Sequence, residues 1–151
     1  MDGLWQWLRN FFSSTDTLTP SEEWLLRNLL DRLPQHLRPI AQAQVACHDR
    51  RQREVGDCAI NFYRSSRAQG SFPLLSMSVE SVPLIRITVA VAGEDAPVHA
   101  TLIAVVDRVF TMHLNRPVMT LSPDALQVTH VKDSWRSNFP RPKECCKEPV
   151  S

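Results

Sequence analysis

Five polar side chains of this chain are suited to binding a small ligand: Gln44, His48, Tyr63, His99 and Arg116. They supply amide, imidazole, hydroxyl and guanidinium groups, the kinds of polar group that orient a ligand in a mostly apolar pocket. Gln44 and His48 are four residues apart, so on a helix their side chains are neighbours. The pair either lines a pocket or forms a satisfied polar contact in the core. The second alternative is favoured, because buried polar groups are normally paired for stability alone.

Signatures of catalysis are absent from the sequence. Gly occurs only at positions 3, 56, 70 and 93, which build no glycine-rich phosphate loop, and no Gly-x-Ser-x-Gly or His-Glu-x-x-His pattern occurs. His36 and His130 lie in different predicted elements and complete no metal-ligand spacing. A paired-carboxylate hydrolase stays open, because such pairs assemble in space. The sequence leans toward a protein that is not an enzyme and that has no metal and no cofactor.

Composition narrows the class of protein further. The chain has 151 residues, of which 43% are hydrophobic and 22% charged, and its formal net charge is +1. This length suits one domain with its own core. The charge balance argues against a nucleic-acid partner, because such proteins usually carry a basic field. Four Cys without a Cys-x-x-Cys pair, and the lack of a signal-peptide pattern, indicate reduced thiols and a cytoplasmic location.

Residues 4–12 predict a strongly amphipathic helix, because their apolar residues fall on one continuous arc of the helical wheel. Four aromatic residues lie on that arc: Trp5, Trp7, Phe11 and Phe12. The favoured interpretation is a helix that covers the core. The alternatives are a surface that binds a protein partner, since Trp and Phe anchor interfaces, and attachment to a membrane surface. Membrane attachment is the weaker alternative, because the polar face carries one Arg and not the several basic residues that anionic lipid attracts.

Two further helices are expected. Thr19-Pro20-Ser21-Glu22 matches a capping box and begins a helix that ends before Pro34. The apolar stripe of the next segment predicts a helix from near Pro34 toward Arg53, so residues 49–54 are expected to be its solvated end. After Gly56 the apolar period changes to two, which predicts strands at 58–64, 84–92, 98–106 and 109–114. Short strands at 74–79 and 127–131 are also expected, the first at a sheet edge.

The register of the predicted sheet follows from two connections. We take residues 107–108 as a two-residue turn and residues 93–97 as a five-residue loop, because this gathers the large aliphatic residues on one face. Ile87 and Ile103 then share the core side, whereas a four-residue loop would place them on opposite faces. His99 falls on the same side as Ile103 and His113 falls on the other. The two histidines are therefore expected not to share a metal ion.

The expected fold class is α+β, with two or three N-terminal helices packed on one face of a four- to five-stranded antiparallel meander. We expect residues 1–18 to form the N-terminal helix and connector, residues 19–131 a single domain, and residues 132–151 a flexible tail. Helices followed by such a meander resemble the cystatin-like and nuclear-transport-factor-like architectures over roughly residues 20–131. This resemblance is architectural and assigns no residue a role.

The sequence therefore favours a small non-catalytic protein–protein interaction module, such as an adaptor, chaperone or inhibitor. Its expected partner-binding residues are Trp5, Trp7, Phe11 and Phe12. The first alternative is a ligand-binding or enzymatic pocket between the helices and the sheet, which Gln44, His48, Tyr63, His99 and Arg116 would line. The second is the peripheral membrane attachment through residues 4–12.

Overall fold

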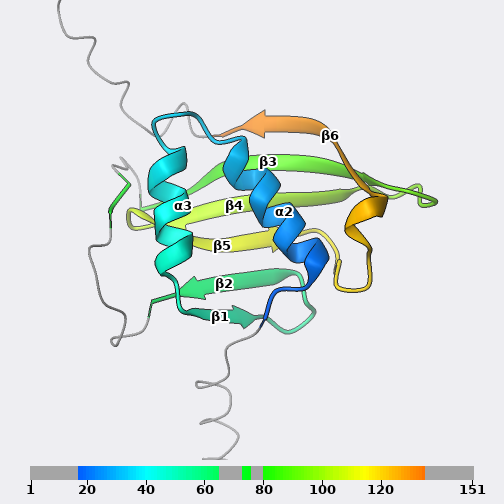
Figure 1. Cartoon of the computed structure of the whole chain (residues 1–151), viewed down its shortest axis with the longest axis horizontal. Helices are drawn as coiled ribbons and strands as arrows, with labels where there is room; N and C mark the ends of the chain where they lie inside the picture. The colour runs from blue at the N-terminus through cyan, green and yellow to red at the C-terminus, as the bar shows by residue number, and fades with distance from the viewer. Residues whose placement is uncertain (1–16, 65–72, 76–79, 135–151) are drawn as a thin grey trace, which may run out of the picture.

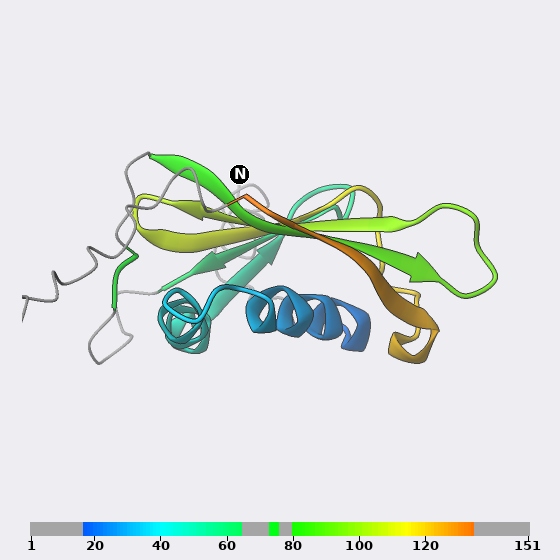
Figure 2. The same cartoon turned by 90° about the horizontal axis from the view of Figure 1, so that it is seen from above.

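The fold is seen in a computed structural model that describes residues 17–64, 73–75 and 80–134. Two helices, α2 (Pro20–Asp31) and α3 (Arg38–Cys47), pack on one face of a six-stranded antiparallel sheet (Figures 1 and 2). The strands are β1 (Arg50–Arg53), β2 (Ala59–Tyr63), β3 (Ser81–Val91), β4 (Val98–Val105), β5 (Arg108–Leu114) and β6 (Leu126–Asp133), and a 3-10 turn, η1 (Pro123–Ala125), precedes β6. The order in the sheet is β1-β2-β5-β4-β3-β6. The predicted α+β class is confirmed, with six strands in place of four or five.

Helix α2 begins as its sequence predicts. The Glu22 backbone N–H donates to Thr19 Oγ1 at 3.4 Å, and the Thr19 backbone N–H donates to Glu22 Oε2 at 2.8 Å, which completes the capping box. The same Glu22 carboxylate is fully buried and pairs with Arg53 of β1, with Nη2 to Oε2 at 2.7 Å. This pair fixes the edge strand β1 to the start of the helical layer.

The predicted extent of the third helix is wrong. Helix α3 ends at Cys47, and His48 already has an extended backbone, with ψ of 111°. Residues 50–53 then pair antiparallel with β2 as strand β1, where a solvated helix end was expected. The sheet supplies hydrogen-bond partners that outweigh the helical pattern of the local sequence.

The predicted register between β3 and β4 is also wrong. Ile87 lies opposite Ala100 and Val89 lies opposite Val98, so the loop between these strands has the even parity that the four-residue alternative requires. Ile87 is fully buried on the helix side, whereas Ile103 is half-buried on the other face. The two isoleucines therefore lie on opposite faces of the sheet.

The β4–β5 connection is a two-residue turn one position earlier than predicted. Val106 and Asp107 have φ of 47° and 63°, the backbone of the mirror-image turn that suits a hairpin. A bulge then shifts the pairing between Ile103 and Ala104, so that Thr101 lies opposite His113. Consequently His99 and His113 share the face away from the helices. Their predicted placement on opposite faces is wrong. The strand register is therefore no longer an argument against a metal ion shared by His99 and His113.

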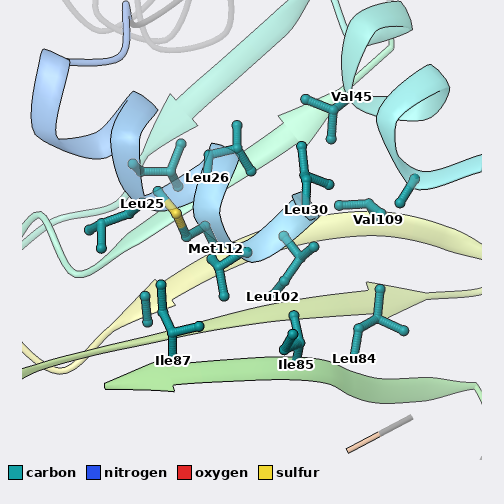
Figure 3. Close-up of a cluster of buried hydrophobic side chains, with 14 of the residues drawn as sticks. Leu25, Leu26, Leu30, Val45, Leu84, Ile85, Ile87, Leu102, Val109 and Met112 are labelled. Atoms are coloured by element: carbon teal, nitrogen blue, oxygen red, sulfur yellow. The ribbon is translucent and has the colours of Figure 1, made fainter. Parts of the chain in front are cut away.

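The core lies between the helices and one face of the sheet. Its fully buried side chains include several from α2 and from the central strands, as Figure 3 shows for Leu25, Ile85, Ile87, Leu102 and Met112. The opposite face of the sheet carries no helix in the described part of the chain (Figure 2). We call it the helix-free face.

Three remaining predictions concern the ends and one edge. Residues 73–75 form no strand, and residues 76–79 lie outside the described residues. Strand β6 continues to Asp133, so residues 132–133, which were expected in the tail, belong to the sheet. Residues 1–16 and 135–151, with the predicted N-terminal helix and most of the tail, lie outside the described residues. No helix in the described ranges has the length and apolar character needed to span a bilayer.

Candidate binding surface

Gln44 stabilises the fold from a fully buried position on α3. Its Nε2 donates to the backbone carbonyls of Pro73, at 2.7 Å, and Asp107, at 3.0 Å. Its Oε1 accepts from the Val109 backbone N–H at 2.8 Å. The side chain thus holds the β4–β5 turn and the segment at residue 73 against α3. These bonds satisfy Gln44 through backbone groups, whereas the predicted core contact was one between Gln44 and His48.

His48 occupies the C-cap of α3 and is buried. Its ring centroid lies 6.1 Å from that of Phe62 on β2. Burial lowers the pKa of His48 below the ordinary 6.5, and the positive charges of Arg108 and Arg51 lower this pKa further, against a raising effect of its hydrogen bond with the Gln44 backbone. A neutral imidazole packed against an aromatic ring suits a structural role.

The five predicted ligand-binding residues do not gather around one cavity. Gln44 and His48 lie on the helix side, whereas Tyr63 and His99 lie on the helix-free face. Arg116 lies beyond the end of β5, where it pairs with Glu94 at 2.5 Å and donates to the Ala96 carbonyl. It therefore braces the β3–β4 turn. The predicted partner-binding residues, Trp5, Trp7, Phe11 and Phe12, lie outside the described residues.

A groove, which we call the α2 groove, is lined by residues of α2, α3 and β1. It has a volume of about 360 Å³ and a mixed lining, in which leucines alternate with both signs of charge: Leu18, Glu23, Leu26, Arg27, Leu30, Asp31, Gln42 and Arg51. None of the five predicted ligand-binding residues lines it. The mixture of charges gives the groove no clear preference for one class of ligand.

The helix-free face carries a group of basic and imidazole side chains that strand pairing brings together. Across β5, β4, β3 and β6, one row reads His113, Thr101, Arg86 and Lys132. The next row, across β4, β3 and β6, reads His99, Thr88 and His130. The Thr88 hydroxyl and His99 Nδ1 are 3.1 Å apart, which confirms that they share this face. We call Arg86, His99, His113, His130 and Lys132 the basic cluster.

Strands β3–β6 supply no acidic counterpart to the basic cluster on its own face, and the acid on that side of the sheet that the structure shows is Glu54, which accepts from Asn61 Nδ2 at 2.8 Å near β2. Asp133 is the only Asp or Glu in the four strands β3–β6, and it lies opposite Ile85, whose side chain is buried under the helices. Arg86 and Lys132 are exposed and directly opposed, and neither forms a salt bridge with an acid of the described chain. Like charges in directly opposed positions destabilise a sheet. The arrangement is thus unfavourable for folding alone and favourable for binding an anion.

Apolar side chains occupy the other end of the same face. Ile103, Val105 and Phe110 are half-buried there, and the rings of Phe110 and Tyr63 meet edge to face, with centroids 5.6 Å apart. Val106 in the adjoining turn is 60% exposed. We call these five residues the apolar end. Aromatic and aliphatic residues beside arginine form the composition that is typical of protein interfaces.

The helix-free face combines a basic and an apolar part. Within residues 17–64, 73–75 and 80–134, no group of three or more His, Cys, Asp or Glu side chains is placed to hold a metal ion. Comparison of the chain with protein-family models, with curated proteins and with solved structures finds no match. The candidate function therefore rests on the physical character of the helix-free face.

The basic cluster could not be predicted from the sequence, because its two cations come from strands that are far apart in the chain. Arg86 was visible as a polar residue within an apolar strand, but Lys132 was assigned to the tail. Only the pairing of β3 with β6 brings the two side chains together.

Proposed function

We propose that the protein is a non-catalytic protein–protein interaction module, of the adaptor, chaperone or inhibitor kind, that binds its partner through the helix-free face. The observation that carries this proposal is the basic cluster beside the apolar end, on a face that no described helix covers. Interfaces combine an apolar centre with a polar rim, and both parts are present here.

The edge strands of the sheet are poorly suited to pairing with a partner chain, which favours a face of the sheet as the binding surface. Strand β1 has only four residues, three of them Arg. Strand β6 carries Lys132 and contains a bulge at Thr129, where Thr88 lies opposite His130 and Val89 opposite Val128. Short, charged or bulged edge strands discourage pairing with another chain. A partner is therefore expected on the face rather than on an edge.

The N-terminal aromatic residues remain a second proposed contact. Trp5, Trp7, Phe11 and Phe12 are proposed to add apolar contacts to the same partner. We propose that the module acts in the cytoplasm, which the free thiols of Cys47 and Cys58 support.

Capture of a stoichiometric partner from native cells tests the proposed function. Three full-length variants are compared with wild type: Phe110→Ala in the apolar end, Arg86→Glu in the basic cluster, and Arg27→Glu on the exposed side of α2 as the charge-matched control. The proposal expects loss of the partner in at least one of the first two variants and its retention in the third. Retention in all of them would place the partner elsewhere.

A further inference from the structure

We infer that the partner segment bound by the helix-free face is an acidic polypeptide with an aliphatic or aromatic anchor. Its carboxylates would meet the basic cluster, and its anchor would meet the apolar end. The inference rests on the proposed function and adds the chemistry of the partner to it.

The charges of the helix-free face favour an acidic partner. Arg86 and Lys132 are adjacent cations on a face from which the acids of β3–β6 are absent. Thr101 lies between His113 and Arg86, and its hydroxyl is able to donate to a carboxylate, whereas the Thr88 hydroxyl already contacts His99 Nδ1. A carboxylate placed here would offset the repulsion between the two cations and accept charge-assisted hydrogen bonds.

The basic cluster and the apolar end are close enough for one short peptide to contact both. The row that contains Arg86 and Thr101 is two residues along the strands from the row that contains Ile103, which is about 7 Å in an extended chain. Val105 is a further two residues along, so the basic cluster and the apolar end are about 7–14 Å apart. An extended segment spans this distance in two to four residues, so one short peptide is able to reach both parts.

The apolar end favours a polypeptide over a nucleic acid. Tyr63 and Phe110 pack edge to face at an interplanar angle of 86°, and Phe110 is half-buried, so the pair does not offer two parallel open ring faces for stacked bases. The neighbouring side chains are aliphatic on β4, and two arginines, Arg50 opposite Tyr63 and Arg108 opposite Val105, border the apolar end. The whole chain also has a net charge of only +1, so it has no long-range field to attract a polyanion.

Titration of the full-length ¹⁵N-labelled protein with synthetic probes tests the inference. The main probe is an eight-residue peptide in which six glutamates flank a central Phe-Leu pair. One matched probe has glutamine in place of every glutamate, another has Gly-Ser in place of Phe-Leu, and the third is an eight-nucleotide oligothymidylate. Amide chemical shifts locate each binding site, and their concentration dependence gives the dissociation constant.

The inference expects the acidic apolar peptide to shift amides of β3–β6 and to bind at least ten-fold more tightly than either peptide control. Arg86→Glu and Lys132→Glu should each weaken it at least ten-fold, whereas Arg27→Glu on α2 should leave it unchanged. Equal binding of the glutamine peptide, shifts confined to the α2 groove, or binding of oligothymidylate without the peptide would each overturn the inference.

The capture experiment separates this inference from the proposed function. Loss of the native partner in the Arg86→Glu variant supports both the interaction module and the acidic partner. Loss with Phe110→Ala alone contradicts the acidic partner and leaves the interaction module in place. Retention of the partner by both variants contradicts the acidic partner and also the helix-free face as the binding surface.

Discussion

Arg86 on β3 and Lys132 on β6 lie directly opposite each other, so two cations are neighbours on the helix-free face of the sheet. Neither has a described acidic residue as a salt-bridge partner. A surface selected only for folding would be expected to place an opposite charge or a neutral residue at one of these positions. We interpret the pair as stability given up for binding, as occurs at functional sites.

Reversing one charge of this pair should stabilise the protein. Arg86→Glu places an acid opposite Lys132, and the free energy of unfolding should rise by about 0.5 kcal/mol. Urea unfolding at low salt measures the change, which should shrink as salt screens the pair. The double variant Arg86→Glu/Lys132→Glu restores a like-charge pair and should lose the gain. A single variant that is less stable than wild type would contradict the repulsion.

Gln44 should be essential for stability because its side chain holds the β4–β5 turn. Gln44→Met keeps the approximate size of the side chain but leaves the Val109 N–H and the Pro73 carbonyl without this partner, which should lower the free energy of unfolding by about 3 kcal/mol. Gln42→Met, at an exposed position of the same helix, should change it by less than about 0.5 kcal/mol. Equal effects of the two variants would show that the three hydrogen bonds of Gln44 do not hold the turn.

The turn at Val106 should be strained. A β-branched residue with φ of 47° is unfavourable by about 1–2 kcal/mol, whereas Asn tolerates this conformation. The turn persists because its backbone is held from outside, with the Val106 N–H donating to the Glu80 carbonyl at 2.8 Å and Asp107 O accepting from Leu75 N at 2.8 Å. Val106→Asn should therefore raise the free energy of unfolding by about 1 kcal/mol. Val105→Asn in the adjoining strand should lower it, and thermal unfolding of the two variants compares them.

His48 should make stability depend on pH. Because burial lowers its pKa in the folded state, the unfolded chain takes up the proton at a higher pH than the folded chain. The stabilisation is fully present above pH 6.5 and is lost as the pH falls from there through the lowered pKa, with a slope of at most about 1.4 kcal/mol per pH unit. His48→Gln should remove this slope, and His36→Gln, at an exposed position, should retain it. Urea unfolding between pH 8 and pH 5 gives both slopes, and an unchanged slope in His48→Gln would contradict the assignment.

Local signals in the sequence predicted the elements better than their pairing. The capping box at Thr19 and Glu22 and the alternation in β3, β4 and β5 reflect contacts within each element, so they were visible without the fold. The strand β1 was not visible, because Arg50–Arg53 has no apolar alternation and is a strand only by pairing with β2.

The faces of the sheet were mispredicted for two reasons: the β3–β4 loop has even parity where a five-residue loop was expected, and a bulge changes the parity of the β4–β5 pairing. Pairing shifts between Pro83 and Ile85, between Ile103 and Ala104, and between Thr88 and Val89. Each added residue reverses which side chains face the core, and the alternation of a single strand does not reveal it. The basic cluster depends on these registers, so its members were read separately and their proximity was not foreseen.

The most direct test of the helix-free face as the binding surface is partner capture by the Arg86→Glu variant. The free energy of unfolding of this variant is measured as well, and Arg27→Glu serves as the control. The account predicts that Arg86→Glu is at least as stable as wild type and yet retains less than a tenth of the partner, while Arg27→Glu retains it. A folded Arg86→Glu variant that captures as much partner as wild type, together with a Phe110→Ala variant that does the same, would contradict the account.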